Sequence, residues 1–89
     1  MIEQTITIIN KLGLHARAAA KLVNTASQFE SQIHISKGAR QADAKSIMSI
    51  MMLAATQGTE IVCTLEGSDE IEAWQQVSAL INNRFDEDE

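Results

Sequence analysis

The chain has 89 residues, a formal net charge of −5 and one cysteine, Cys63. Its hydrophobic content of 45% and charged content of 21% are typical of a globular protein and exclude a disordered chain. An aromatic content of 3% leaves no stacking surface for single-stranded nucleic acid, and the net charge disfavours binding to a duplex. We predict a single domain over residues 1–89 that does not bind nucleic acid.

Charge is distributed unevenly along the chain. The first fifty residues carry +3 and the remainder −8, of which residues 86–89 supply −4 as a short acidic tail. We therefore expect one locally basic face on an acidic protein. The longest apolar stretch, residues 47–56, is far too short for membrane insertion. A lone cysteine forms no internal disulfide, which favours a cytoplasmic location.

The first half of the chain alternates between strand and helix periodicity. Apolar and polar residues alternate over 2–8, which predicts a strand, and apolar residues at helical spacing predict a helix over 16–29. A second alternating segment, 32–36, is followed by a turn at Gly38 and a short arm over 40–43. This pattern predicts a β-hairpin.

The second half predicts a short helix over 47–55, a strand over 59–66 and a final helix. Asp69 begins that helix, with Glu72 three residues later as in a capping box. The predicted buried stripe of the final helix is Ile71, Trp74, Val77, Ile81 and Phe85.

The predicted order of elements is β-α-β-β-α-β-α. Strands with one apolar face and amphipathic helices favour an antiparallel sheet with one face covered. We therefore predict the α+β class, as an open-faced β-sandwich in which three helices cover one side of a four-stranded antiparallel sheet.

His15 falls at the junction between a loop and the first predicted helix. A helix N-terminus presents unpaired N–H groups and a partial positive charge, which together bind anions. A neutral imidazole there is a nucleophile whose phosphorylated form gains those donors, with Arg17 as a charged partner and Lys11 and Lys21 adding a positive field. Gly13 suits a tight approach of the preceding loop.

The simpler interpretation is that His15 is only a polar residue near a helix start. No carboxylate lies nearby in sequence to orient its ring, and no second histidine stands at ligand spacing, so we predict neither a metal nor a cofactor. His34 falls on the polar side of its strand and is expected to be an ordinary surface residue.

A second candidate site opens the central helix. Ser46 is a good N-cap, and a serine at a helix start is also a place where an added phosphate is stabilised. Ile47, Met48 and Met51 meet across one turn, either as core or as an exposed docking surface. Because this helix has almost no polar face, we expect part of it to be exposed.

The segments NKLGLHARAAAKL and AKSIMSIMMLAATQG, together with the order of elements, resemble the HPr phosphocarrier family of the bacterial phosphotransferase system. The resemblance covers essentially the whole chain, as one HPr-like domain. The family motif GLHARPA is reproduced at residues 13–17 and at Ala19, with Ala18 in place of the usual proline. Alanine is a strong helix former, so we expect the helix to survive with a looser turn.

The resemblance implies that His15 accepts a phosphoryl group on its δ nitrogen from enzyme I and passes it to a histidine of a IIA-type acceptor protein. It implies that Arg17 stabilises this phosphate. It also implies that Ser46 is a regulatory serine in lineages with HPr kinase/phosphorylase. The docking residues for enzyme I and the acceptors are then Lys45, Ile47, Met48 and Met51.

Two alternatives remain open. The family has a sugar-transport branch and a nitrogen-related regulatory branch; the ending FDEDE resembles the second, whereas KSIM fits the kinase-regulated type. The chain is alternatively a non-catalytic regulatory module that binds a kinase or transcription factor through Ile47, Met48 and Met51. A carrier that presents one face to several partners is most simply a monomer, and a self-contained hydrolase is disfavoured because no acid/base pair accompanies the histidine.

Overall fold

The computed structural model describes all residues from 1 to 89, and it confirms the predicted order of elements. None of the helices is long and apolar enough to cross a membrane. The elements are β1 (Ile2–Thr7), α1 (Ala16–Ala26), β2 (Gln32–Lys37), β3 (Arg40–Asp43), α2 (Ile47–Met52), β4 (Glu60–Glu66), α3 (Glu70–Asn82) and a short 3-10 turn, η1 (Arg84–Asp86).

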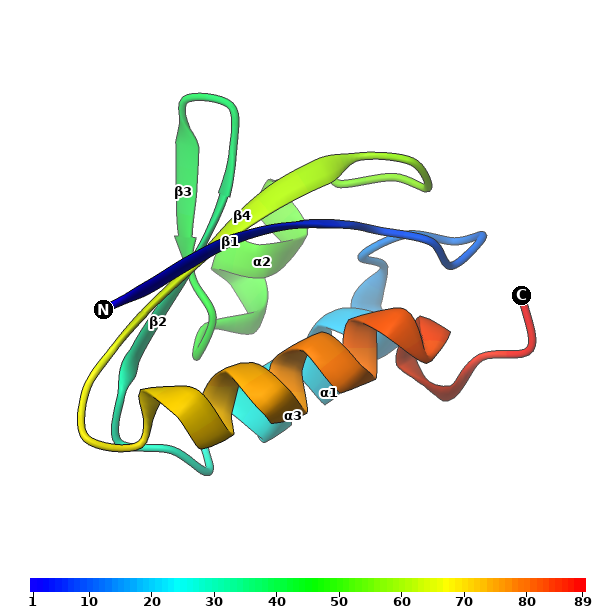
Figure 1. The fold of residues 1–89 in the computed structure, drawn as a ribbon. Helices are drawn as coiled ribbons and strands as arrows, with labels where there is room; N and C mark the ends of the chain where they lie inside the picture. The colour runs from blue at the N-terminus through cyan, green and yellow to red at the C-terminus, as the bar shows by residue number, and fades with distance from the viewer.

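The four strands form one antiparallel sheet in the order β1-β4-β2-β3. Figure 1 shows the helices packed against one side of this sheet, with α1 and α3 running side by side. The predicted hairpin is present, since Lys37 pairs with Arg40 across the turn that contains Gly38. The predicted fold class is therefore confirmed.

Twenty buried residues form the core between the sheet and the helices. The alternation of β4 sends Ile61, Cys63 and Leu65 inward, where they belong to the same buried cluster as Ala19 and Leu22 of α1. Desolvation by burial raises the pKa of the Cys63 thiol to about 12, so this side chain remains protonated and inert near neutral pH.

The predicted stripe of α3 is partly wrong. Ile71 is 62% exposed, whereas Ala73 is fully buried together with Val77 and Ile81. Ala73, Val77 and Ile81 recur every four residues, and Ile71 lies roughly 200° around the helix from Ala73 at 3.6 residues per turn. The small size of Ala73 lets the helix approach the sheet on that side.

The predicted capping box at the start of α3 is also wrong. The Asp69 carboxylate caps no N–H of its own helix; it accepts hydrogen bonds from the backbone N–H groups of Glu30 and Ser31, both at 2.9 Å, and from the Ser31 hydroxyl. Glu70, rather than Glu72, reaches back to the N–H of Gly67 at 3.2 Å. Asp69 thus ties the start of α3 to the segment that leads into β2.

This tie predicts a pH-dependent contribution of Asp69 to stability. The Ser31 hydroxyl, helped by the N–H groups of Glu30 and Ser31, holds the pKa of Asp69 below its usual value. A depressed native pKa stabilises the fold above the unfolded-state pKa of about 3.9 and loses this effect as pH falls through the native pKa. Asp69→Asn should therefore unfold at lower urea concentration than the wild type at pH 7, and the gap should narrow near pH 3.

Glu72→Gln is the matched control, because Glu72 lies in the same first turn, is exposed, and makes no hydrogen bond or ion pair. Its urea midpoint should follow that of the wild type at both pH values. An equally large gap for Asp69→Asn at pH 7 and pH 3 would contradict the assignment.

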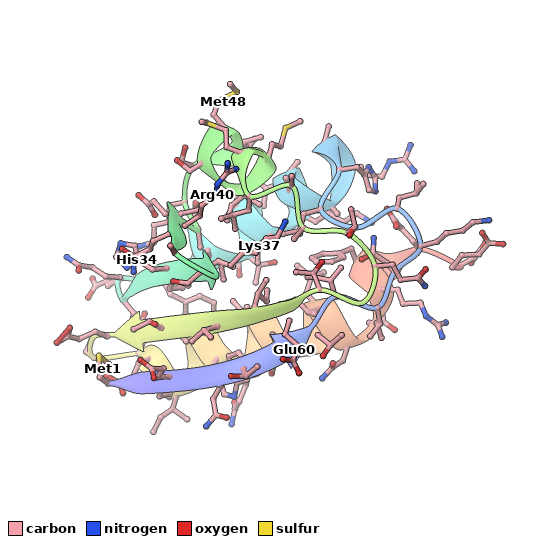
Figure 2. All side chains as sticks on the ribbon, turned by 90° about the horizontal axis from the view of Figure 1, so that it is seen from above. Met1, His34, Lys37, Arg40, Met48 and Glu60 are labelled. Atoms are coloured by element: carbon pink, nitrogen blue, oxygen red, sulfur yellow. The ribbon has the colours of Figure 1, made fainter.

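The central helix is shorter than predicted, ending at Met52 instead of Ala55. Ala54 adopts a left-handed conformation with φ of 52°. The carbonyls at this end receive side chains from the β2–β3 hairpin: Lys37 Nζ donates to Leu53 O and Ala54 O, and Arg40 donates to Met52 O, each at 3.2 Å (Figure 2). The C-terminal end of α2 is therefore capped by the positively charged side chains of Lys37 and Arg40 from the neighbouring hairpin.

The left-handed Ala54 predicts a stabilising substitution. Its Cβ destabilises the folded state by roughly 1–2 kcal/mol in this conformation. Glycine removes this cost, but its greater freedom in the unfolded chain lowers the stability by about 0.5–1 kcal/mol. Ala54→Gly should therefore raise the free energy of unfolding by about 0.5–1 kcal/mol. Ala79→Gly, at an exposed position inside α3, should lower it by a similar amount, and urea titrations compare the two. A loss in both variants would contradict the prediction.

Candidate functional site

His15 is the N-cap of α1, with extended backbone angles of φ −75° and ψ 178°. Its carbonyl accepts the first helical hydrogen bond from Ala19 N–H at 2.8 Å, and its ring Nδ1 accepts from Arg17 N–H at 3.3 Å. The N–H groups of Ala16 and Ala18 at the same helix end make no hydrogen bond within the protein. His15 Nδ1 therefore lies among donors that an anion attached to it can use.

The loop before His15 is held close to the segment that follows α2. Gly13 has φ of +67°, and a Cβ at that position would lie 2.5 Å from the backbone oxygen of Ala55. The same oxygen accepts a hydrogen bond from Leu14 N–H at 2.9 Å. Only glycine permits this approach, which explains why it stands two residues before the histidine.

Ala18 is fully buried at the third position of α1, so the helix forms without the family's usual proline, as expected. Since the Ala18 N–H has no partner, a proline here would remove no hydrogen bond. The looser turn expected from Ala18 remains a prediction.

Arg17 is exposed, and its guanidinium makes no hydrogen bond or ion pair within the chain. It stands at the rim of an open pocket that also contains His15, Lys11 and Lys21. Residues 86–89, the acidic tail, line the same pocket. Three of the six basic residues in the first fifty, Lys11, Arg17 and Lys21, therefore meet the acidic tail at the histidine.

The tail reaches this place because of an unusual turn after α3. Arg84, Phe85 and Asp86 all have left-handed backbones, with φ of 57°, 53° and 64°, although none is a glycine. Phe85 is fully buried, and Lys21 Nζ donates to its carbonyl at 2.8 Å. Lys21 also lies 3.7 Å from Asp86 Oδ2. The buried ring and the lysine hold the turn that directs the tail back toward α1.

Two further contacts fix the tail across the site. Lys11 N–H donates to Glu89 O at 2.9 Å, and Lys11 Nζ lies 3.2 Å from Glu89 Oε2. Glu87 lies in the tail between Asp86 and Glu89. Its Oε2 contacts His15 Nε2, and its Oε1 accepts a hydrogen bond from Asn10 Nδ2 at 3.0 Å. The tail therefore supplies a carboxylate that touches the histidine ring.

Burial raises the pKa of the Glu87 carboxyl, but hydrogen bonds from Asn10 and His15 outweigh it and hold the pKa below its usual value. No local sequence pattern indicated Glu87 as a site residue, because it lies 72 residues from His15 along the chain. The one available signal was the acidic ending in a chain whose other half is basic.

Ser46 is the N-cap of α2, as predicted, and its Oγ accepts from Ser49 N–H at 3.3 Å. Lys45 is half-buried, and its Nζ donates to Phe29 O at 2.7 Å. The expected exposure of α2 is confirmed, since Met48 projects from the molecule (Figure 2). The exposed apolar side chains of α2 are Ile47 at 41%, Met48 at 69%, Met51 at 40% and Met52 at 68%; Met52 was not among the predicted residues.

His34 lies on β2, half-buried, opposite Asp43 on β3. It is not among the residues that line the pocket at His15. The two histidines of the chain are therefore in different surroundings. Only His15 lies at a helix N-terminus beside Lys11, Arg17, Lys21 and the acidic tail.

Comparisons with known proteins agree with this geometry. A family model described as the PTS HPr component phosphorylation site matches residues 2–83. A phosphocarrier protein HPr of Xylella fastidiosa is 53% identical over 88 residues, covering 99% of each chain. The crystal structure of an HPr from Thermoanaerobacter tengcongensis superposes with a TM-score of 0.96 at 48% identity over the whole of both chains, and an HPr dimer from the same organism superposes with 0.79 at 49% identity, covering 98% of this chain and all of that one.

Proposed function

The chain belongs to the HPr family of phosphocarriers of the phosphotransferase system, and we propose that His15 is the side chain on which it carries the phosphoryl group. The observation that supports this most is the position of Nδ1 at the start of α1, beside the Arg17 N–H and the unpartnered N–H groups of Ala16 and Ala18. These donors and the partial positive charge of the helix end stabilise a phosphate there.

The proposed reaction is a transfer between two histidines. The Nδ1 lone pair of His15 attacks the phosphorus of phosphohistidine on enzyme I, and the donor P–N bond breaks with its electron pair returning to the donor imidazole. The Arg17 guanidinium, which has no partner in the chain, is free to take the incoming oxygens. The reverse step, with a IIA-type acceptor histidine, delivers the group onward.

The exposed apolar surface of α2 is the proposed docking surface for enzyme I and the acceptors. Ile47, Met48 and Met51 supply most of it, and Met52 extends it. Flexible methionine side chains adapt to several partners, which suits a carrier that must bind a donor and then an acceptor. Lys45 is tied to Phe29 O and contributes a positive charge at the edge of this surface.

We further propose that phosphorylation of Ser46 by an HPr kinase/phosphorylase weakens docking. About two negative charges at this N-cap favour the helix but disrupt an apolar interface at the neighbouring Ile47 and Met48. Ser46→Asp should raise the KM for transfer from enzyme I about tenfold, a change of ~1.4 kcal/mol. Ser46→Asn keeps the cap without charge and should behave as the wild type. Equal KM values for Ser46→Asp and Ser46→Asn would contradict the proposal that charge on Ser46 weakens docking.

The test of the main proposal is incubation with enzyme I and phosphoenolpyruvate. Intact-mass measurement should show one added phosphate that is lost in acid and survives in base, and fragmentation should place it on His15 and not on His34. No phosphate on this chain, with an enzyme I that phosphorylates another carrier, would overturn the proposal.

The second candidate is a regulatory module that binds a kinase or transcription factor through the α2 surface, with no need of His15. The four exposed apolar side chains of α2 are the observation in its favour. We propose that either activity takes place in the cytoplasm and that the chain acts as a monomer. Both the sugar-transport and the nitrogen-related branch fit, and the identity of the acceptor that takes the phosphate decides between them.

A further inference from the structure

The two ring nitrogens of His15 contact groups of opposite hydrogen-bonding character. Nδ1 faces the backbone N–H of Arg17, which is only a donor, so Nδ1 presents its lone pair. Nε2 faces Oε2 of Glu87, and an ionised carboxylate is only an acceptor, so Nε2 carries the proton. The two contacts together select one neutral tautomer of the ring.

Glu87 is held in this position by buried groups. Asn10 is fully buried, and its Nδ2 donates both to Glu87 Oε1 at 3.0 Å and to Gly13 O at 2.8 Å, which links the carboxylate to the loop that carries His15. Phe85, two residues before Glu87, is buried in the core. The side chain of Glu87 itself is only 13% exposed.

The other charged groups at the pocket do not take this role. The positive ones are Lys11, Arg17 and Lys21, and the negative ones are the carboxylates of residues 86–89. Lys21 pairs with Asp86 and Lys11 with Glu89, while Asp88 makes no hydrogen bond or ion pair. Glu87 is therefore the one tail carboxylate that reaches the ring.

We propose that Glu87 is a positioning residue that directs phosphorylation of His15 to Nδ1, by holding the ring proton on Nε2. This inference deepens the proposed function, since it takes His15 as the acceptor. In the transfer step the Nδ1 lone pair forms the N–P bond, the leaving group departs with its electron pair, and the ring becomes a phosphoimidazolium that still carries its Nε2 proton. Glu87 shares this proton and balances the new positive charge, which keeps the ring a good leaving group for the next transfer.

Replacement by glutamine should reverse the selection. Asn10 Nδ2 is a donor and keeps the amide oxygen of the new side chain on its own side, so the amide NH₂ turns toward His15 Nε2. Nε2 then becomes the acceptor and Nδ1 competes for the proton. Glu87→Gln therefore changes the chemistry of the contact while it preserves its shape.

The test uses phosphoramidate, a small phosphoryl donor that acts without a partner protein and releases ammonia. All variants carry His34→Gln, so His15 is the only histidine, and ³¹P NMR distinguishes the Nδ1 and Nε2 products. The wild-type tail should give mainly the Nδ1 product, and Glu87→Gln should lower the Nδ1:Nε2 ratio by about tenfold or more, as expected for loss of a hydrogen bond to a charged group. Asp88→Asn, which removes the same charge from the same tail at an exposed residue without a hydrogen bond or ion pair, should keep the wild-type ratio.

An unchanged ratio in Glu87→Gln, or a wild-type product mainly on Nε2, would overturn the inference. A second measurement needs no phosphate: ¹H–¹⁵N NMR of the His15 ring should show the proton on Nε2 in the wild type and a larger Nδ1–H population in Glu87→Gln. Because neither experiment contains enzyme I, failure of enzyme I to phosphorylate the chain would remove the proposed function and leave these results standing.

Discussion

Replacing His15 with alanine is expected to abolish acid-labile phosphorylation by enzyme I and phosphoenolpyruvate. The other nitrogen side chains that line the pocket are Lys11, Arg17 and Lys21, and the two lysines pair with tail carboxylates. A lysine ammonium has no lone pair with which to attack phosphorus. The loss should therefore be complete, and it is measured as the acid-labile phosphate bound per chain.

His34→Ala is the matched control and should accept phosphate as the wild type does, since His34 lies on β2 away from the pocket. His15→Ala removes an N-cap, which costs about 1 kcal/mol, so circular dichroism should still show a folded chain at 25 °C. Phosphate retained by His15→Ala and lost in His34→Ala would assign the phosphoryl group to His34 on β2 and overturn the proposal.

Phe85→Ala is expected to lower the free energy of unfolding by about 3–5 kcal/mol, the usual cost of truncating a buried phenylalanine. Phe85 is fully buried at a point where three successive left-handed residues already strain the backbone. Without the ring, the turn loses the contact that offsets this strain. Urea unfolding measures the change in stability, and heteronuclear relaxation measures the expected increase in motion of residues 86–89.

Phe29→Ala is the control for loss of an aromatic ring, because Phe29 is only half-buried against the core. Its cost should be clearly smaller. Phe85→Leu should recover much of the stability lost in Phe85→Ala. If Phe85→Ala and Phe29→Ala cost the same, then Phe85 is not the anchor of the tail.

The fold could be predicted from the sequence where a pattern of apolar and polar side chains is compatible with only one buried face. Ile61, Cys63 and Leu65 alternate with polar residues, and this alternation fixes which face of β4 is buried. Ile71 was placed wrongly because an apolar residue on a mostly polar turn is compatible with helical spacing, and only the packing of Ala73 against the sheet determines the phase.

The candidate site was predictable only as far as local sequence reaches. His15, Arg17 and the helix start belong to one short segment, so their arrangement follows from the helix itself. Glu87 depends on a turn of three left-handed residues that contains no glycine and carries no sequence signal. The contact between Glu87 and His15 exists because Phe85 is buried, which is a property of the completed core.

The position of the two chain ends has a practical consequence. The C-terminal residue is bound to Lys11 beside His15, whereas the N-terminus lies at the opposite end of the molecule in Figure 1. A purification tag or fluorescent protein fused after Glu89 would pull on the segment that holds Glu87, and a fusion before Met1 would leave it in place. Assays of transfer rates, and any biosensor built from this protein, should therefore be made with N-terminal fusions or after a C-terminal fusion has been cleaved off.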